Sequence, residues 1–148
     1  MNPTKLARIA LCVAALGLTL SGALGGASAG AAGPKLVVTP STNLHNGEKV
    51  KVSGSGFKPG DTVYIVECLV KAKGESGCTI SNLVVVTITK SGDLPRSTFK
   101  VASGKIGSGK QMCGTKTSNL KSCAVSAGNE SGGDSAVFPI AFKAPAKK

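Results

Sequence analysis

The stretch from Val50 to Thr89 most constrains the fold of this 148-residue chain. It holds an alternating strand, a tight turn, an apolar run at residues 63–70, a loop with a Cys at each end, and a second apolar strand. A strand covered on one side only should alternate apolar with polar residues. Residues 63–70 instead carry two apolar sets, Val63, Ile65 and Leu69 on one face and Tyr64, Val66, Cys68 and Val70 on the other. One face can pack into a core, and the other needs a second sheet, a hairpin or a ligand.

The first 29 residues have the pattern of a secretion signal. Lys5 and Arg8 precede an apolar run from Ile9 to Leu24, and Ala27-Ser28-Ala29 fits a small-residue cleavage site. Removal of the first 29 of 148 residues leaves 119, which is enough for one core. We therefore expect a secreted protein divided into a signal peptide at 1–29, a disordered lead-in at 30–34, one domain at 35–143 and a basic tail at 144–148.

The expected mature chain is strongly basic. Without Lys5 and Arg8, 16 basic residues stand against 7 acidic ones, which gives a net charge near +9. Such a charge favours anionic surfaces such as nucleic acid, anionic lipid or acidic cell-wall polymer, although solubility alone is an equally good explanation. The basic residues are scattered along the sequence and are not interleaved with aromatic residues, so base stacking is not indicated.

Four Cys residues remain in the mature chain, and an even number in an exported protein argues for two disulfides. The sequence allows three pairings, of which Cys68–Cys78 and Cys113–Cys123 are the simplest because both are local. Loops this short should each stabilise the fold by roughly 2–3 kcal/mol in the chain-entropy model. A zinc site is the alternative, but the chain has no CxxC pair and only one His, so we expect no metal.

Short apolar segments separated by turn signals extend through the mature chain. Turn sequences such as Asn46-Gly47 and Pro59-Gly60 fall between them. We expect strands at residues 35–39, 48–55, 62–70, 83–89, 94–101 and 136–142, a hairpin or a looped strand at 112–125, and no helix. This pattern predicts an all-β fold, a seven-stranded antiparallel immunoglobulin-like sandwich with two short disulfide-stapled loops. We expect the protein to be a monomer.

No catalytic arrangement stands out in the sequence. His45 is the only His and lies in a turn beside Asn46-Gly47, where an exposed turn residue is the simpler interpretation. The seven carboxylates are dispersed, and the four mature Cys residues serve better as bridges than as nucleophiles. We therefore predict no catalytic residues and no enzymatic activity.

The second apolar face of residues 63–70 is the positive functional signal. If Val125 is a core residue, its neighbours Ala124 and Ser126 lie on the opposite face of their strand, where small side chains leave room. The two faces and a Cys68–Cys78 bridge could then form a shallow cleft. The predicted ligand-binding residues are Tyr64, Val66, Cys68, Val70, Leu83, Ile106, Ala124, Ser126 and Gly128. In the alternative interpretation, the hairpin of residues 68–83 covers a thicker core and leaves no cleft.

With these strands and Cys pairs in place, the sequence resembles the neocarzinostatin family of secreted actinobacterial enediyne-binding apoproteins. The matching features are VTPSTNL near the mature start, NGEKVKVSGSGFKPGDTVYIVEC, a second Cys ten residues on, and CAVSAGN before an apolar final strand. The resemblance implies an immunoglobulin-like barrel whose cleft non-covalently holds an enediyne chromophore, which cleaves DNA after release. It implies a pocket at Val66, Cys68, Val70, Leu83, Ala124, Ser126 and Gly128.

The sequence departs from the family pattern in three respects. Chromophore-binding members place aromatic rings around the cleft, whereas here Val70, Leu83 and Ile106 stand at the corresponding positions, which weakens stacking on a polycyclic ligand. The loop between Cys113 and Cys123 is longer than the usual one. The well-known members are acidic, whereas this chain is strongly basic.

Together these observations predict a secreted apoprotein that binds and shields a hydrophobic small molecule similar to an enediyne chromophore. Its activity would be antibiotic and directed at DNA through the ligand, and no cofactor other than such a chromophore is expected. The alternative is a basic extracellular adhesion or envelope-interaction module without a small ligand, whose charge binds an anionic cell-envelope polymer or DNA.

Overall fold

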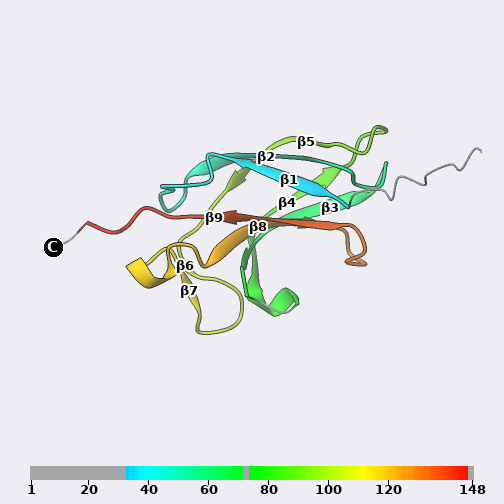
Figure 1. The fold of residues 1–148 in the computed structure, drawn as a ribbon. Coiled ribbons are helices and arrows are strands. Elements are labelled where there is room, and N and C mark those ends of the chain that lie inside the picture. The colour runs from blue at the N-terminus through cyan, green and yellow to red at the C-terminus, as the bar shows by residue number, and fades with distance from the viewer. Residues whose placement is uncertain (1–32, 72–73, 147–148) are drawn as a thin grey trace, which may run out of the picture.

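The computed structural model describes residues 33–71 and 74–146 of the chain (Figure 1). Within these ranges it contains strands and two short 3-10 turns, η1 (Glu75–Gly77) and η2 (Thr117–Asn119), and no α-helix. The secretion signal predicted for residues 1–29 lies outside the described residues. The strands are β1 (Lys35–Thr39), β2 (Lys49–Ser55), β3 (Thr62–Leu69), β4 (Cys78–Thr87), β5 (Leu94–Lys100), β6 (Gly104–Lys105), β7 (Met112–Cys113), β8 (Cys123–Gly128) and β9 (Ser135–Ile140).

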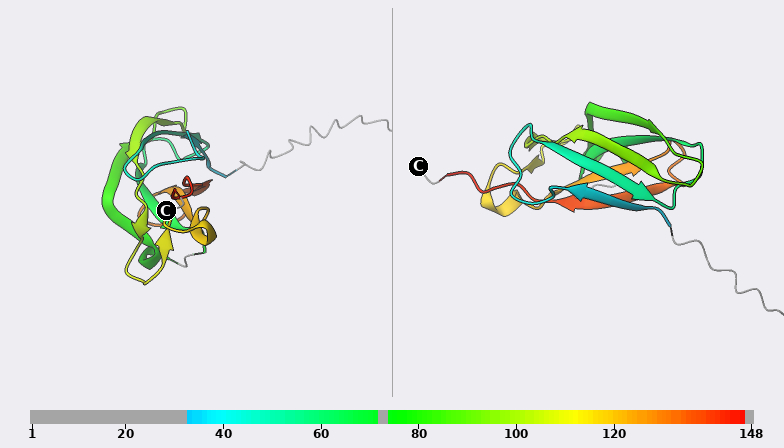
Figure 2. Two further views of the ribbon diagram at one scale, coloured as in Figure 1. Left: turned by 90° about the vertical axis from the view of Figure 1, so that its left-hand side faces the viewer. Right: turned by 90° about the horizontal axis from the view of Figure 1, so that it is seen from above.

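Seven of these strands form two antiparallel sheets, and β6 and β7 form a separate two-stranded pair. The strand order is β1-β2-β5 in the first sheet and β4-β3-β8-β9 in the second. Figure 1 shows the first sheet lying over the second, and the left view of Figure 2 shows β4 along the side where the two layers meet. The predicted seven-stranded antiparallel sandwich is confirmed.

The core lies between the two sheets because alternate residues of each strand point inward. Val50 and Phe99 of the first sheet are completely buried, as are Val63, Ile65 and Val125 of the second. Burial of each such side chain stabilises the fold by roughly 1.5–3 kcal/mol. Since the odd-numbered residues of β3 point inward, its even-numbered residues stand on the outer face of the four-stranded sheet.

The turn at residues 58–61 connects the two sheets as the sequence predicts. The Asp61 N–H donates to the Lys58 carbonyl at 3.2 Å, which closes a β-turn between β2 and β3. Pro59 supplies the fixed φ of the second turn position. Gly60 has a φ of 79°, the positive value that the third position of a type II turn requires.

The main difference from the predicted strands lies in the β3–β4 hairpin. β4 begins at Cys78, well before the predicted start at Leu83. The pairs Cys68–Cys78 and Glu67–Thr79 extend the hydrogen-bonded ladder through a segment whose side chains are mostly polar. Backbone pairing with β3 therefore makes a strand where side-chain composition indicates a loop.

Both predicted disulfides are present. Cys68–Cys78 joins the ends of β3 and β4, and Cys113–Cys123 joins β7 to β8. In each bridge the two Cys residues are ten positions apart. All four Cys residues in the described part of the chain are therefore used in bridges, and they hold local loops together rather than joining one large sheet to the other.

Candidate functional site

A cleft of about 650 Å³ lies on the outer face of the four-stranded sheet. Outward residues of β3, β8 and β9 form its floor. The β3–β4 hairpin forms one wall, and the β8–β9 turn forms the other. The lining residues are Tyr64, Val66, Cys68, Leu69, Val70, Gly74, Glu75, Cys78, Ile80, Leu83, Ser126, Gly128, Asn129, Glu130, Gly132, Ser135 and Val137.

The strand register explains why the floor is hollow. Residues on three neighbouring strands stand side by side across it, in the two rows Val66–Ser126–Val137 and Tyr64–Gly128–Ser135. The middle member of each row comes from β8 and is small. The larger side chains of β3 and β9 therefore flank a trough that runs along β8.

Apolar side chains stand open to solvent around this trough. Ile80 is 79% exposed, Val137 61%, Val70 48% and Leu83 39%. A group of exposed apolar side chains on one face of a soluble protein marks an interaction or ligand site. The hairpin of residues 68–83 thus forms a wall of the cleft. It does not cover a thicker core, as the alternative interpretation of the sequence required.

Two of the nine predicted ligand-binding residues lie elsewhere. Ile106 is 1% exposed and belongs to the core cluster, because the segment that contains it folds back through the pairing of β6 with β7. Ala124 is completely buried between Cys68 of β3 and Pro139 of β9. The structure brings the other seven together at the cleft, where ligand binding stays a prediction: Tyr64, Val66, Cys68, Val70, Leu83, Ser126 and Gly128.

The sequence analysis missed ten residues that line the cleft. The alternation of β9, with Ala136 buried and Val137 exposed, was an available signal for that strand. The turn residues carry no such signal, because their place depends on how each turn folds back over the sheet. The missed residues are Leu69, Gly74, Glu75, Cys78, Ile80, Asn129, Glu130, Gly132, Ser135 and Val137.

The chemistry of the lining is aliphatic with an acidic rim. Tyr64 is the one aromatic residue that lines the cleft, and the chain has no other Tyr and no Trp. Among the described residues, Glu75 and Glu130 are the charged ones that line the cleft, and no described Lys or Arg lines it although the protein is basic. Such a surface can bury an apolar molecule and disfavours an anionic one.

Glu67 is a buried acidic residue that the sequence analysis did not single out. It is completely buried on the inner face of β3. Its Oε2 accepts a hydrogen bond from the Ala102 N–H at 2.8 Å, whereas its Oε1 has no partner among the described residues. Burial raises the pKa of the Glu67 carboxyl from 4.5 to about 7, against the opposing effects of Ala102 and Asn82.

Asn82 is a second polar residue at this site. It lies beside Glu67, and the Asn82 Nδ2 donates to the Lys100 carbonyl at 2.5 Å while its Oδ1 is buried without a partner in the described part of the chain. The sulfurs of Cys113 and Cys123 are within 4.8 Å of the carboxylate, but their disulfide excludes a metal site there.

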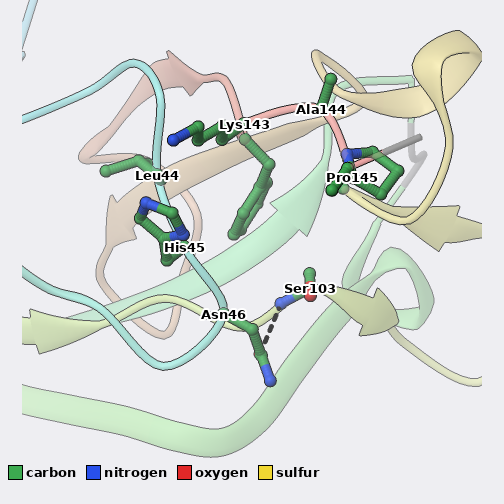
Figure 3. Close-up of a pocket in the computed structure, with 10 residues that line it drawn as sticks. Leu44, His45, Asn46, Ser103, Lys143, Ala144 and Pro145 are labelled. Carbon is green, nitrogen blue, oxygen red and sulfur yellow. Dashed lines mark hydrogen bonds between the residues drawn. The ribbon is translucent and has the colours of Figure 1, made fainter. Parts of the chain in front are cut away.

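A smaller hollow of about 300 Å³ lies between the turn at residues 44–46 and the segment 142–146 (Figure 3). His45 and Lys143 border it, and Asn46 Oδ1 accepts a hydrogen bond from the Ser103 N–H at 3.0 Å. No acidic side chain lines this hollow. His45 therefore lacks there the carboxylate that orients the imidazole of a hydrolytic triad.

Known proteins share both the sequence and the fold. The model of the neocarzinostatin family matches residues 36–142. Macromomycin from Streptomyces macromomyceticus is 32% identical over 104 residues, which cover 67% of this chain and 70% of that protein. The solved structure of macromomycin has a TM-score of 0.56 at 32% identity, with 74% of this chain and 98% of that one covered. The solution structure of apokedarcidin has a TM-score of 0.53 at 24% identity, covers 75% of this chain and 99% of that one, and supports the fold alone.

The family match includes both sheets, both disulfides and the cleft. Within residues 33–71 and 74–146, no helix has the length and apolar character needed to cross a membrane. The extent of the family match and the identity with macromomycin lead to one conclusion: this chain belongs to the neocarzinostatin family.

Proposed function

We propose that this protein is a secreted apoprotein that carries a hydrophobic small molecule in the cleft of its four-stranded sheet. Proteins of the neocarzinostatin family are secreted chromophore carriers and are generally non-enzymatic. The proposed cargo is an enediyne-type chromophore or a smaller relative, held without a covalent bond. We further propose that the released cargo acts on DNA and thereby gives the protein an antibiotic activity.

The main support for this proposal is that exposed apolar side chains surround a hollow of suitable size. The cleft volume of about 650 Å³ falls within the range of roughly 300–1,000 Å³ that is usual for small-molecule sites. Val70, Ile80, Leu83 and Val137 would all lose contact with water when a cargo fills the trough. Each Å² of apolar surface removed from water favours binding by about 25 cal/mol.

The composition of the cleft narrows the class of cargo. Since Tyr64 supplies the one aromatic ring, most of the binding free energy must come from aliphatic contact rather than from stacking. The carboxylates of Glu75 and Glu130 disfavour a cargo with its own negative charge. A neutral or cationic apolar molecule suits the site best.

The position of Tyr64 provides a direct binding assay. Because the chain has one Tyr and no Trp, its intrinsic fluorescence comes from this cleft residue. Titration with a neutral naphthoate ester should quench that emission in a saturable way. A polycyclic, uncharged compound without a naphthalene ring serves as a second probe.

A matched pair of variants tests whether the quenching comes from the cleft. Leu83→Lys places a charge in the wall, and we expect at least a tenfold loss of affinity, equivalent to about 1.4 kcal/mol. Val85→Lys adds the same charge at the next outward position of β4, which is 54% exposed and does not line the cleft. It should bind as the wild type does. Absence of saturable quenching by both probes, or equal losses in the two variants, would refute the proposal.

A second candidate function is an extracellular envelope-interaction module that needs no small ligand. The net charge of the expected mature chain, near +9, favours it. The two functions differ in their response to salt, because binding to a polyanion weakens steeply as salt rises whereas capture of a neutral apolar ligand hardly changes. The basic residues of one sheet form a surface that could bind such a polyanion.

A further inference from the structure

The basic residues that lie on strands of the two large sheets all belong to one of them, although basic residues are scattered along the sequence. The strands β1, β2 and β5 contain five basic residues and no acidic one. The strands β3, β4, β8 and β9 contain no Lys or Arg, and their single acidic residue is the buried Glu67. The five residues of the three-stranded sheet are called the basic face below and are Lys35, Lys49, Lys51, Arg96 and Lys100.

The basic face points away from the core. All five side chains are exposed, whereas their strand neighbours Val50, Val52 and Phe99 are completely buried. Alternate residues on one strand are roughly 7 Å apart, and neighbouring strands are about 4.8 Å apart. The charges therefore form an array spread over the three-stranded sheet, whereas the cleft lies on the four-stranded sheet.

The array is not neutralised by nearby acids. Lys49 and Lys100 stand directly opposite each other in the register of β2 and β5, an arrangement of like charges that destabilises a sheet. The Lys51 Nζ donates to Thr98 Oγ1 at 2.6 Å, and among the described residues the five basic side chains form no salt bridge.

The two acidic residues next to these strands are engaged in turns. Glu48 precedes β2, and its Oε2 accepts a hydrogen bond from the His45 N–H at 2.8 Å. Asp93 precedes β5, and its Oδ2 accepts one from the Ser91 hydroxyl at 2.5 Å. The five positive charges of the strands exceed the two negative charges that flank them, so this sheet presents a net positive surface.

We propose that the basic face binds a linear polymer of the cell envelope whose backbone consists of phosphodiesters. Lysine ammonium groups contact phosphates as point charges, and the array offers several of them to successive phosphates of one chain. The cleft lies on the other sheet, so polymer and cargo can be bound at the same time. The protein would then be retained at an envelope surface while it holds its cargo.

The side chains of the basic face favour this partner over the other polyanions. No aromatic, Asn or Gln side chain occurs in β1 or β2, and the one aromatic residue of β5 is the buried Phe99, so the basic face has no platform for base stacking and no amide side chain to read adenine. Val37, 51% exposed, is the only large apolar side chain exposed on these strands, which is too little for insertion into a lipid surface.

The salt dependence of polymer binding gives an expected magnitude. If all five charges contact phosphates, and the coefficient for single-stranded nucleic acid holds, log K should fall with log[salt] with a slope of about −3.5. Affinity should then fall about 100-fold between 50 and 200 mM salt. Binding of the neutral naphthoate ester in the cleft should be unchanged over the same range.

Two triple variants of equal net charge test the assignment. In the face variant, Lys49, Lys51 and Lys100 become Gln; in the loop variant, the exposed Lys105, Lys110 and Lys121 become Gln. Binding to purified poly(glycerol phosphate) lipoteichoic acid is measured by titration at several salt concentrations. We expect the face variant to bind at least tenfold more weakly than the wild type, and its slope of log K against log[salt] to be less negative by about 2. The loop variant should behave as the wild type.

Other outcomes would overturn the proposal. Equal losses in the two variants would show that net charge alone attracts the polymer. Tighter binding to duplex DNA, or to vesicles of anionic lipid, than to lipoteichoic acid would assign the basic face to nucleic acid or to membrane instead. No binding by the wild type at 50 mM salt would refute it outright. Quenching of Tyr64 by the naphthoate ester, measured in the same variants, tests the carrier function separately.

Discussion

Replacement of Glu67 by Gln would isolate the free energy of a buried carboxyl group. The folded protein holds the Glu67 proton up to a pKa of about 7, whereas the ordinary value is 4.5. Between these pH values the folded state binds more protons than the unfolded state, so stability must fall as pH rises. Glutamine keeps the shape of the side chain and an acceptor for the Ala102 N–H, and it does not ionise.

The expected magnitude follows from the two pKa values. Each pH unit between them corresponds to about 1.4 kcal/mol, so ionisation of Glu67 lowers the free energy of unfolding by about 3 kcal/mol. This stability is fully present below pH 4.5, is lost as pH rises to 7, and stays lost above it. In a domain of this size, 3 kcal/mol shifts Tm by roughly 10 °C.

Urea unfolding and thermal unfolding of both proteins at several pH values from 4.5 to 8 would measure the effect. Glu67→Gln should match the wild type at pH 4.5 and exceed it by about 3 kcal/mol at pH 8. Glu130→Gln removes the same charge from an exposed site and should keep the wild-type profile. A wild-type pH profile that runs parallel to that of Glu67→Gln would refute the reasoning, as would a Gln variant less stable than the wild type at pH 8.

Two further changes give sharp expectations. Gly92 has a φ of 82°, and an added Cβ would lie 2.7 Å from the Phe57 carbonyl oxygen, so Gly92→Ala should destabilise by about 2 kcal/mol or more in urea unfolding. Gly60 has a φ of 79° but open space around it, so Gly60→Ala should cost only about 1 kcal/mol; equal effects would contradict this account. Ser126→Phe should fill the trough beside Val66 and abolish quenching of Tyr64 without a change in Tm, and retained quenching would show that the cargo binds elsewhere.

Local patterns were enough to predict the sandwich and seven of the 17 residues that line the candidate site. The two apolar faces of β3 can be read from residues 63–70 alone, because a period of two decides which side chains share a face. The same rule applied to β8 places Ser126 and Gly128 toward the cleft. The short Cys spacings favour local bridges for both disulfides.

The features that the sequence analysis missed depend on contacts between distant segments. Ile106 lies in a stretch of Gly, Ser and Lys, and its burial follows from the pairing of β6 with β7. Glu67 interrupts an apolar face, and its environment is set by Ala102 and Asn82, which lie on other segments. The basic face requires the order β1-β2-β5, which joins strands far apart in the chain.

The Cys68–Cys78 bridge has a consequence for when the cleft becomes complete. The ring that it closes includes Val70 and Glu75, which line the wall, and Ile80 follows directly on β4. A cytosolic chain keeps its thiols reduced, and this bond forms only in an oxidising compartment. If the chain is exported as proposed, it leaves the cytosol with these two thiols still reduced, and the wall of the cleft becomes covalently fixed only after oxidation outside the cell.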